Sequence, residues 1–199
     1  NPLSNLRLGS GLAAVRAMLE RGLAVGIGTD AVATSDTQNM FEAARLAAYL
    51  SRLRGDEYSQ WLSVEEAFGL ATAGSARVLG FAGKIGTIAK GACADLVFLD
   101  LAHINYVPLR NALLQLVNGE SGSAIDAVMV GGRFVMQQGR LLTVDEARLR
   151  RDAEAARERL DRANEAALAT ARQLQDWVGQ FCIAHARAVP LPARRLPAE

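Results

Sequence analysis

Apolar residues recur at helical spacing near the start of the chain, and a short run of small and apolar residues follows them. Residues 12–19 have this spacing, which predicts an amphipathic helix that ends at a C-capping Gly22. The next residues, "LAVGIG" (23–28), are apolar on both faces, as in strands of parallel sheets covered by helices. The pattern predicts a short buried strand that stops at Thr29-Asp30.

A second helix is expected after this strand, with Ser35 or Asp36 as its N-cap. Its inward positions are predicted to be Phe41, Ala44, Leu46 and Leu50. Helix, buried strand and helix together make one α/β unit. The preceding segment, "NPLSNLRLGSG" (1–11), is predicted to be an irregular loop that leads into the first helix.

Capping boxes predict the starts of two more helices. "SVEE" pairs Ser63 with Glu66 and opens an alanine-rich helix that ends at Gly80. "TVDE" opens, at Thr143, a long charged helix that reaches about residue 186. The apolar positions of this last helix form a narrow stripe, typical of a helix that lies on a surface: Leu149, Ala153, Ala156, Leu160, Ala163 and Ala167.

Strands are predicted after residue 84, where glycines and alternating apolar residues replace the helical pattern. Residues 95–100 predict one strong strand. "AIDAVMVGGRFVMQQG" has two apolar runs joined by Gly131-Gly132, which predicts a β-hairpin. We therefore expect a second sub-structure, rich in strands, beside the α/β unit.

Composition narrows the class of protein. The charges nearly cancel, with 22 Lys and Arg against 21 Asp and Glu, which argues against binding to nucleic acid or to an anionic membrane. No apolar run reaches the roughly 18 residues of a membrane span, and no signal peptide is visible. Cys93 and Cys182 form no CxxC pair, which fits a reducing cytoplasm but leaves one disulfide open.

The two ends of the chain carry their own predictions. The chain opens on Asn1 rather than Met, so we expect it to be a portion of a longer polypeptide. Residues 187–199 contain three prolines and are predicted to be disordered.

Asp30 is the first candidate for chemistry. A carboxylate at the carboxyl end of a strand in an α/β structure can bind a metal, act as a base, or only cap the next helix, and the residues alone leave these roles open. Asp36 is the better-placed cap, which leaves Asp30 less explained by structure. The loop at 1–11 is the second candidate, because Ser4 and Asn5 can meet polar ligand groups there. Its alternative role is an ordinary connection.

Other polar residues are expected to be structural. His103 and His185 are the only histidines, have no HxH or HExxH partner, and are predicted to be surface residues. Cys93 is predicted to be a small core residue. The Arg/Glu run at 147–162 is predicted to be a solvated helix face with i,i+4 pairs.

Four motifs, taken in order, resemble the C-terminal half of the amidohydrolase superfamily. They are "NPLSNLRLGSG", "GLAVGIGTDAVATSDTQNMFEAARLAAYL", "LATAGSARVLGFAGKIGTIAKGACADLVFLD" and "VMVGGRFVMQQG". The resemblance is to the branch of deaminases and chlorohydrolases that act on guanine, 8-oxoguanine, S-adenosylhomocysteine or triazines. It covers nearly all of residues 1–150.

The resemblance implies an α/β fold: the C-terminal part of a (β/α)₈ TIM-type barrel, strands of a small β-sandwich, and a long C-terminal helix. The implied divisions of the chain are 1–83 for the barrel, 84–142 for the sandwich, 143–186 for the helix and 187–199 for the tail. It makes 23–28 the eighth barrel strand and Asp30 a metal ligand and proton shuttle. Ser4 and Asn5 then lie near the substrate pocket.

The resemblance also implies a metal-dependent hydrolase that deaminates a purine-like or other N-heterocyclic small molecule with metal-activated water. The divalent metal is expected to be zinc, with iron as the second choice, in a cytoplasmic homo-oligomer. The family's HxH and its other histidine ligands are absent here, so the isolated chain is expected to be inactive. A dechlorinating or N-dealkylating hydrolase, or a non-catalytic assembly module, remains the alternative.

Overall fold

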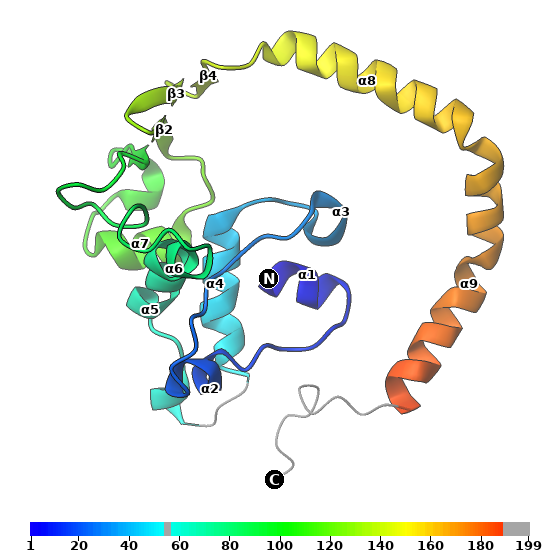
Figure 1. Cartoon of the computed structure of the whole chain (residues 1–199), viewed down its shortest axis with the longest axis horizontal. Coiled ribbons are helices and arrows are strands. Elements are labelled where there is room, and N and C mark those ends of the chain that lie inside the picture. Colours follow the sequence, from blue (N-terminus) through cyan, green and yellow to red (C-terminus); the bar gives the residue numbers. More distant parts are fainter. Residues whose placement is uncertain (54–56, 189–199) are drawn as a thin grey trace. The chain divides into compact units, whose positions relative to one another are not determined.

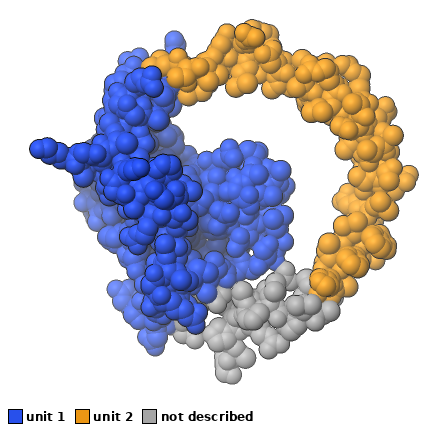
Figure 2. Space-filling model, viewed as in Figure 1, with its two compact units in different colours: residues 1–140, 193–199 blue, residues 141–192 orange. Residues whose placement is uncertain are grey.

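The structure is a computed structural model that describes residues 1–53 and 57–188, with side chains to residue 185. The described residues form two compact units, 1–140 and 141–188, coloured blue and orange in Figure 2. Figure 1 shows the order of the helices and strands.

The first residues form a helix, α1 (Pro2–Arg7), so the predicted irregular loop is wrong there. Pro2 stands in the first turn, where its fixed φ favours a helix and its missing N–H costs nothing. The Asn5 N–H donates to the Asn1 carbonyl at 3.0 Å and closes the turn.

Helix α2 (Val15–Glu20) confirms the predicted amphipathic helix, and Gly22 follows it with a φ of 70°. The predicted strand at 23–28 is not formed. The Ile27 N–H instead donates to the Leu70 carbonyl at 3.3 Å and to the Ser75 hydroxyl at 3.1 Å. Strand geometry needs a neighbouring strand, and no described strand lies beside this run, so a helical segment satisfies part of its backbone.

The next helices are α3 (Val32–Ser35) and α4 (Met40–Ser51). The cap of α4 is Asn39, whose Oδ1 accepts N–H bonds from Phe41 and Glu42 at 2.9 and 3.2 Å. The prediction of Ser35 or Asp36 as this N-cap is therefore wrong. The Ser35 hydroxyl donates to backbone carbonyls instead, and Asp36 is the residue at which α3 ends. The buried face of α4 consists of Ala43, Ala44, Ala47 and Ala48. Of the predicted inward positions, Ala44 is buried, whereas Phe41, Leu46 and Leu50 are half-buried.

A short helix, η1 (Tyr58–Gln60), leads to α5 (Val64–Gly69), the π-helix η2 (Leu70–Gly74) and α6 (Ser75–Val78). The predicted capping box of α5 is confirmed, with both hydrogen bonds between Ser63 and Glu66 present. One core cluster joins this region to α4 and to the run at 23–28: Ile27, Ala43, Ala44, Ala47, Leu62 and Leu70.

The strands form one sheet of four, in the order β1 (Leu96–Leu99), β2 (Ile125–Val130), β3 (Arg133–Gln137) and β4 (Arg140–Leu141). β1 pairs with β2, and β2 with β3, in antiparallel fashion, which confirms the predicted strand and the hairpin at Gly131-Gly132. Between β1 and β2 lie η3 (Ile104–Tyr106) and α7 (Ala112–Gly119).

The second unit contains α8 (Glu146–Ala163) and α9 (Glu165–Ala188). The cap of α8 is Asp145, which accepts from the Arg148 N–H at 2.9 Å, so the predicted box at Thr143 is wrong by two residues. Pairs of Arg148 with Asp152 and of Arg157 with Asp161 confirm the solvated charged face. Of the tail predicted to be disordered, 187–199, the first two residues belong to α9, so the prediction is wrong there, and residues 189–199 lie outside the described residues. Within the described ranges, no helix is both long and apolar enough to cross a membrane.

Candidate functional site

Asp30 lies at the end of the run at 23–28, exposed to solvent, with its backbone in the left-handed region at a φ of 66°. This conformation is uncommon for a residue other than glycine and recurs at functional sites. Its Oδ1 accepts from the Ala31 N–H at 2.7 Å. Asp30 is the N-cap of neither helix that follows it: the N-cap of α3 is Ala31, with no side-chain cap bond, and the N-cap of α4 is Asn39.

The surroundings of Asp30 favour the ionised carboxylate. The pKa of this group is lowered first by the Ala31 N–H, then by the Ser4 hydroxyl and, more weakly, by the Thr34 hydroxyl. Hydrogen bonds to the charged form hold the proton off. Asp30 is therefore an anion at neutral pH, the state in which a carboxylate binds a cation or accepts a proton.

The structure brings Ser4 to Asp30 but places Asn5 elsewhere. Ser4 is only 3% exposed, and its hydroxyl contributes to the low pKa of Asp30. Asn5, on the next position of α1, lines a cavity whose lining includes neither Ser4 nor Asp30. The two predicted substrate residues thus face different surroundings.

Sequence reasoning missed two residues of this region. The Thr34 hydroxyl, which donates to the Ala31 carbonyl at 2.9 Å, helps to lower the pKa of Asp30, and the Gln38 side-chain amide donates to the Asp30 carbonyl at 3.4 Å. The signal was present, since "TSDTQN" (34–39) is an unbroken polar run directly after the aspartate.

The cavity has a volume of about 360 Å³ and lies between α2, α4 and residues 25–27. Much of its lining is apolar, and its polar members are Asn1, Asn5, Arg16, Glu20, Ser51 and Gln60. It therefore runs along the backbone of the segment that ends at Asp30, rather than around the carboxylate itself.

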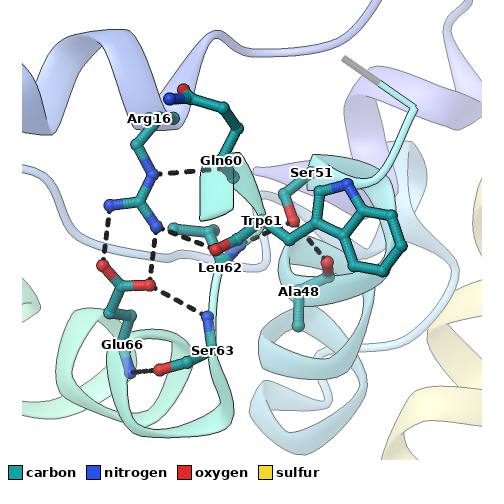
Figure 3. Close-up of polar contacts among 8 residues, drawn as sticks. All are labelled: Arg16, Ala48, Ser51, Gln60, Trp61, Leu62, Ser63 and Glu66. Atoms are coloured by element: carbon teal, nitrogen blue, oxygen red, sulfur yellow. Dashed lines mark hydrogen bonds and ion pairs between the residues drawn. The ribbon is translucent and has the colours of Figure 1, made fainter. Parts of the chain in front are cut away.

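An ion pair between Arg16 and Glu66 joins α2 to α5 (Figure 3). The Arg16 guanidinium donates to both carboxylate oxygens of Glu66 at 2.8 and 2.7 Å, and to the Gln60 and Trp61 carbonyls at 3.3 and 2.9 Å. The pKa of Glu66 is lowered, first of all by the bond from Arg16. Figure 3 also shows the Ser51 hydroxyl, which accepts from the Leu62 N–H at 2.9 Å and so joins α4 to the same segment. These bonds make a rigid support for α2, α4 and α5.

The histidines and the first cysteine take structural or surface positions. His103 is half-buried and caps η3, accepting from the Asn105 N–H at 3.3 Å. His185 is exposed and stacks on Phe181. Cys93 is exposed, so its predicted core position is wrong. It precedes β1 in a turn, where its N–H donates to the Lys84 carbonyl at 2.8 Å and its side chain faces out.

A metal would find an incomplete set of ligands here. Among residues 1–53 and 57–188, no group of three or more His, Cys, Asp or Glu side chains is placed to hold a metal ion. The described side chains therefore do not form a metal site by themselves. Asp30, exposed and ionised, is the one predicted ligand that this chain offers.

Comparisons with known proteins agree on one family. The sequence model of the amidohydrolase family matches residues 1–135. The 5-methylthioadenosine/S-adenosylhomocysteine deaminase of Bacillus cytotoxicus is 41% identical over 150 residues, which is 75% of this chain and 34% of that protein. The chain thus spans about a third of the length of the curated relatives that it matches.

Solved structures point the same way. An adenosine deaminase from Xanthomonas campestris with bound zinc has a TM-score of 0.76 at 33% identity, covering 80% of this chain and 36% of that one. The atrazine chlorohydrolase TrzN from Arthrobacter aurescens, complexed with zinc, has a TM-score of 0.71 at 30% identity, covering 77% and 34%. These neighbours indicate a TIM-barrel-type fold. The chain belongs to the amidohydrolase family.

Proposed function

We propose that the intact protein containing this chain is a metal-dependent hydrolase that deaminates a purine-like or other N-heterocyclic small molecule. The carrying observation is Asp30, an exposed and ionised carboxylate in a left-handed conformation at the tip of the run at 23–28. It lies inside the part of the chain that matches the family. The relatives named as deaminases, one of them at 41% identity, set the substrate class.

Asp30 acts in this proposal as a ligand and as a proton carrier. A bound divalent metal, zinc before iron, lowers the pKa of water so that hydroxide is available near neutral pH. The carboxylate needs to be ionised for either of its roles, and the Ala31 N–H and the Ser4 hydroxyl favour that form. Ser4 thus favours the ionised form of Asp30, while Asn5 stays a proposed substrate contact. The remaining ligands have to come from other parts of the intact protein.

The proposed architecture completes the barrel and the sandwich. We assign 1–83 to the last strands and helices of a (β/α)₈ barrel, 84–142 to a β-sandwich and 143–186 to a C-terminal helical segment. In support, the cavity of about 360 Å³ lies along residues 25–27, where a neighbouring barrel strand would pack. On the sheet, the ring centroids of Phe98 and Phe134 lie 5.9 Å apart, and the two residues are 39% and 41% exposed. Such exposure is expected of a sheet face that a second sheet covers.

Two further expectations complete the proposal. Both cysteines are free and exposed, which suits the reducing cytoplasm. The exposed apolar residues of α9, among them Trp177 and Phe181, suit a subunit or domain contact in a homo-oligomer.

Dechlorination is the second candidate, because a chlorohydrolase is among the structural neighbours at 30% identity. The test is an assay of the intact, zinc-loaded protein for two products. We expect ammonia from methylthioadenosine or S-adenosylhomocysteine and no chloride from a chlorotriazine. Chloride without ammonia would establish dechlorination instead, and turnover of neither would favour the non-catalytic assembly module.

A further inference from the structure

Glu120, directly after α7, is a fully buried carboxylate that no proposed chemistry uses. Its Oε1 accepts three backbone N–H bonds, from Ser121 at 2.9 Å, Gly122 at 2.7 Å and Ala124 at 3.2 Å. Burial, the largest single cause, raises the pKa of Glu120, but the backbone N–H groups of the loop together with the Tyr106 hydroxyl outweigh it, and the pKa is lowered. The carboxylate thus fixes the backbone of the loop at 120–124.

The inner side of this loop is closed by Tyr106, which is 1% exposed. Its hydroxyl faces Glu120, and burial followed by that carboxylate raises the pKa of Tyr106 to about 12. The hydroxyl and the second carboxylate oxygen, Oε2, have no hydrogen bond of standard geometry to a described residue. Oε1 thus accepts all three backbone N–H bonds that the Glu120 carboxylate receives, and all three come from the loop that follows α7.

The outer side of the loop is bound to α4. The Arg45 guanidinium donates to the Asn118 carbonyl at 3.0 Å and to the Glu120 carbonyl at 3.4 Å. The Asn39 side-chain amide donates to the Ser121 carbonyl at 2.8 Å. Arg45 of α4 and its cap Asn39 thus bind carbonyls at the end of α7 and in this loop. The Ser121 carbonyl belongs to the peptide group whose N–H, that of Gly122, is bonded to Glu120.

Asn39 also ends the segment that carries Asp30. This segment has left-handed backbone at both Asp30 and Asp36, with φ of 66° and 61°, which residues other than glycine adopt unfavourably. A strained segment persists only where its surroundings hold it. Inside the segment, Gln38 donates to the Asp30 carbonyl at 3.4 Å, and at its end Asn39 is bonded both to α4 and to Ser121.

We propose that Glu120 is a positioning residue for Asp30. It shapes the loop at 120–124, the Ser121 carbonyl of this loop holds Asn39, and Asn39 fixes the end of the strained segment at 30–39. Glu120 never contacts substrate and acts through these backbone carbonyls. The inference rests on the proposed function for its catalytic consequence, whereas its structural step can be tested without turnover.

The sharpest variant is Asn39→Asp, because aspartate keeps the cap of α4 but cannot donate to the Ser121 carbonyl. Asn111→Asp is the matched control. Asn111 caps α7 through the Leu114 N–H at 2.9 Å, and its amide group has no bond to another described element. The two variants carry the same chemical change in the same capping role.

Glu120→Ala removes the carboxylate, and Glu120→Gln is its conservative rescue. The glutamine amide oxygen can still accept the three N–H bonds that Oε1 accepts. We therefore expect Glu120→Gln to stay near wild type in every readout and Glu120→Ala to behave like Asn39→Asp.

The first readout is amide hydrogen exchange in the intact protein at Thr34–Thr37, whose N–H groups bond within the segment. We expect exchange to be roughly 2- to 10-fold faster in Asn39→Asp and Glu120→Ala, the change that one lost hydrogen bond brings, and unchanged in Asn111→Asp. Unchanged exchange at 34–37 in folded Asn39→Asp would overturn the proposal.

The second readout is turnover of whichever substrate the wild type uses. We expect kcat to fall roughly tenfold with KM little changed in Asn39→Asp, since a displaced proton carrier affects the reacting step. Faster exchange with wild-type kcat would also overturn the positioning role. A wild type that releases no ammonia would refute the proposed deaminase instead, and the exchange result would still decide whether Glu120 holds the segment.

Discussion

Helices α4 and α8 both follow a capping residue and both have a regular apolar pattern, yet they end in opposite surroundings. α4 buries four alanines and contacts α1, α5 and α7. α8 buries no residue, and its leucines Leu149 and Leu160 are 56% and 60% exposed. Ion pairs along its own surface support it instead.

The difference shows what holds each region. The small side chains of α4 let other helices approach closely, so tertiary packing stabilises it. α8 relies on local interactions, which contribute little each. The family match ends at residue 135, before α8 begins, so the packed region coincides with the part that the family shares. The following predictions test this contrast.

The largest effect is expected where backbones touch. At Gly26 an added Cβ would lie 2.7 Å from the Ser75 Cα, so Gly26→Ala forces the run at 23–28 away from α6. We expect a loss of about 2–3 kcal/mol in unfolding free energy, measured by urea denaturation of the intact protein. Gly69→Ala, with open space around its Cβ, is the control and should not destabilise. Equal stability of Gly26→Ala and wild type would show that this packing is wrong.

The two kinds of ion pair should differ next. Arg16 is 24% exposed and serves Glu66 and two carbonyls, so Arg16→Met should cost about 2 kcal/mol. Arg157→Met removes solvated pairs on α8 and should leave the denaturation midpoint unchanged within error. A similar loss in both variants would contradict the contrast between the regions.

A third prediction concerns alkaline pH. The folded pKa of Tyr106, about 12, lies above the ordinary value of 10.0 for tyrosine, so the native state keeps this proton to higher pH than the unfolded state does. The stability from this group is complete below pH 10 and is lost as pH rises toward 12. Urea denaturation between these values should show the decline in wild type and a smaller one in Tyr106→Phe. Identical slopes in the two proteins would refute the assignment.

The smallest effect is expected in α9. Gly179 lies inside this helix with nothing within 4 Å of an added Cβ. Gly179→Ala should therefore raise local helix stability by about 0.5–1 kcal/mol, seen as slower amide exchange around residue 179. Alanine is thus expected to stabilise the protein locally at position 179, whereas it destabilises the protein at position 26. A destabilised Gly179→Ala variant would mean that α9 is packed against something at this position.

The sequence predicted features that local chemistry decides. The capping box of Ser63 and Glu66 and the hairpin at Gly131-Gly132 were found because the residues that form them are adjacent. The run at 23–28 was expected to be a strand, but strand pairing depends on a neighbour that no described residue supplies. A local sequence pattern does not show whether a neighbouring strand is present to pair with.

Errors at caps have a similar cause. Ser35, Asp36 and Asn39 are all good capping residues, and the structure has Asn39 as the N-cap of α4. The Asn39 amide also donates to the carbonyl of Ser121, a residue far away in the sequence, and local patterns do not show such a contact. Of the candidate site, Asp30 was found by its position after an apolar run. Ser4 was predicted as a residue near the substrate pocket, and its contribution to the ionisation of Asp30, like that of Thr34, emerged only from the structure.

The most direct test of the account compares Asp30→Asn with Asp36→Asn in the intact protein. Both aspartates are exposed and left-handed, and asparagine tolerates that conformation, so both variants should keep the wild-type melting temperature. Asp36 only pairs with Arg7 at the surface. We predict that kcat falls roughly 10³-fold or more in Asp30→Asn, because an amide cannot carry the proton, and stays at the wild-type value in Asp36→Asn. Wild-type turnover by Asp30→Asn would contradict the account.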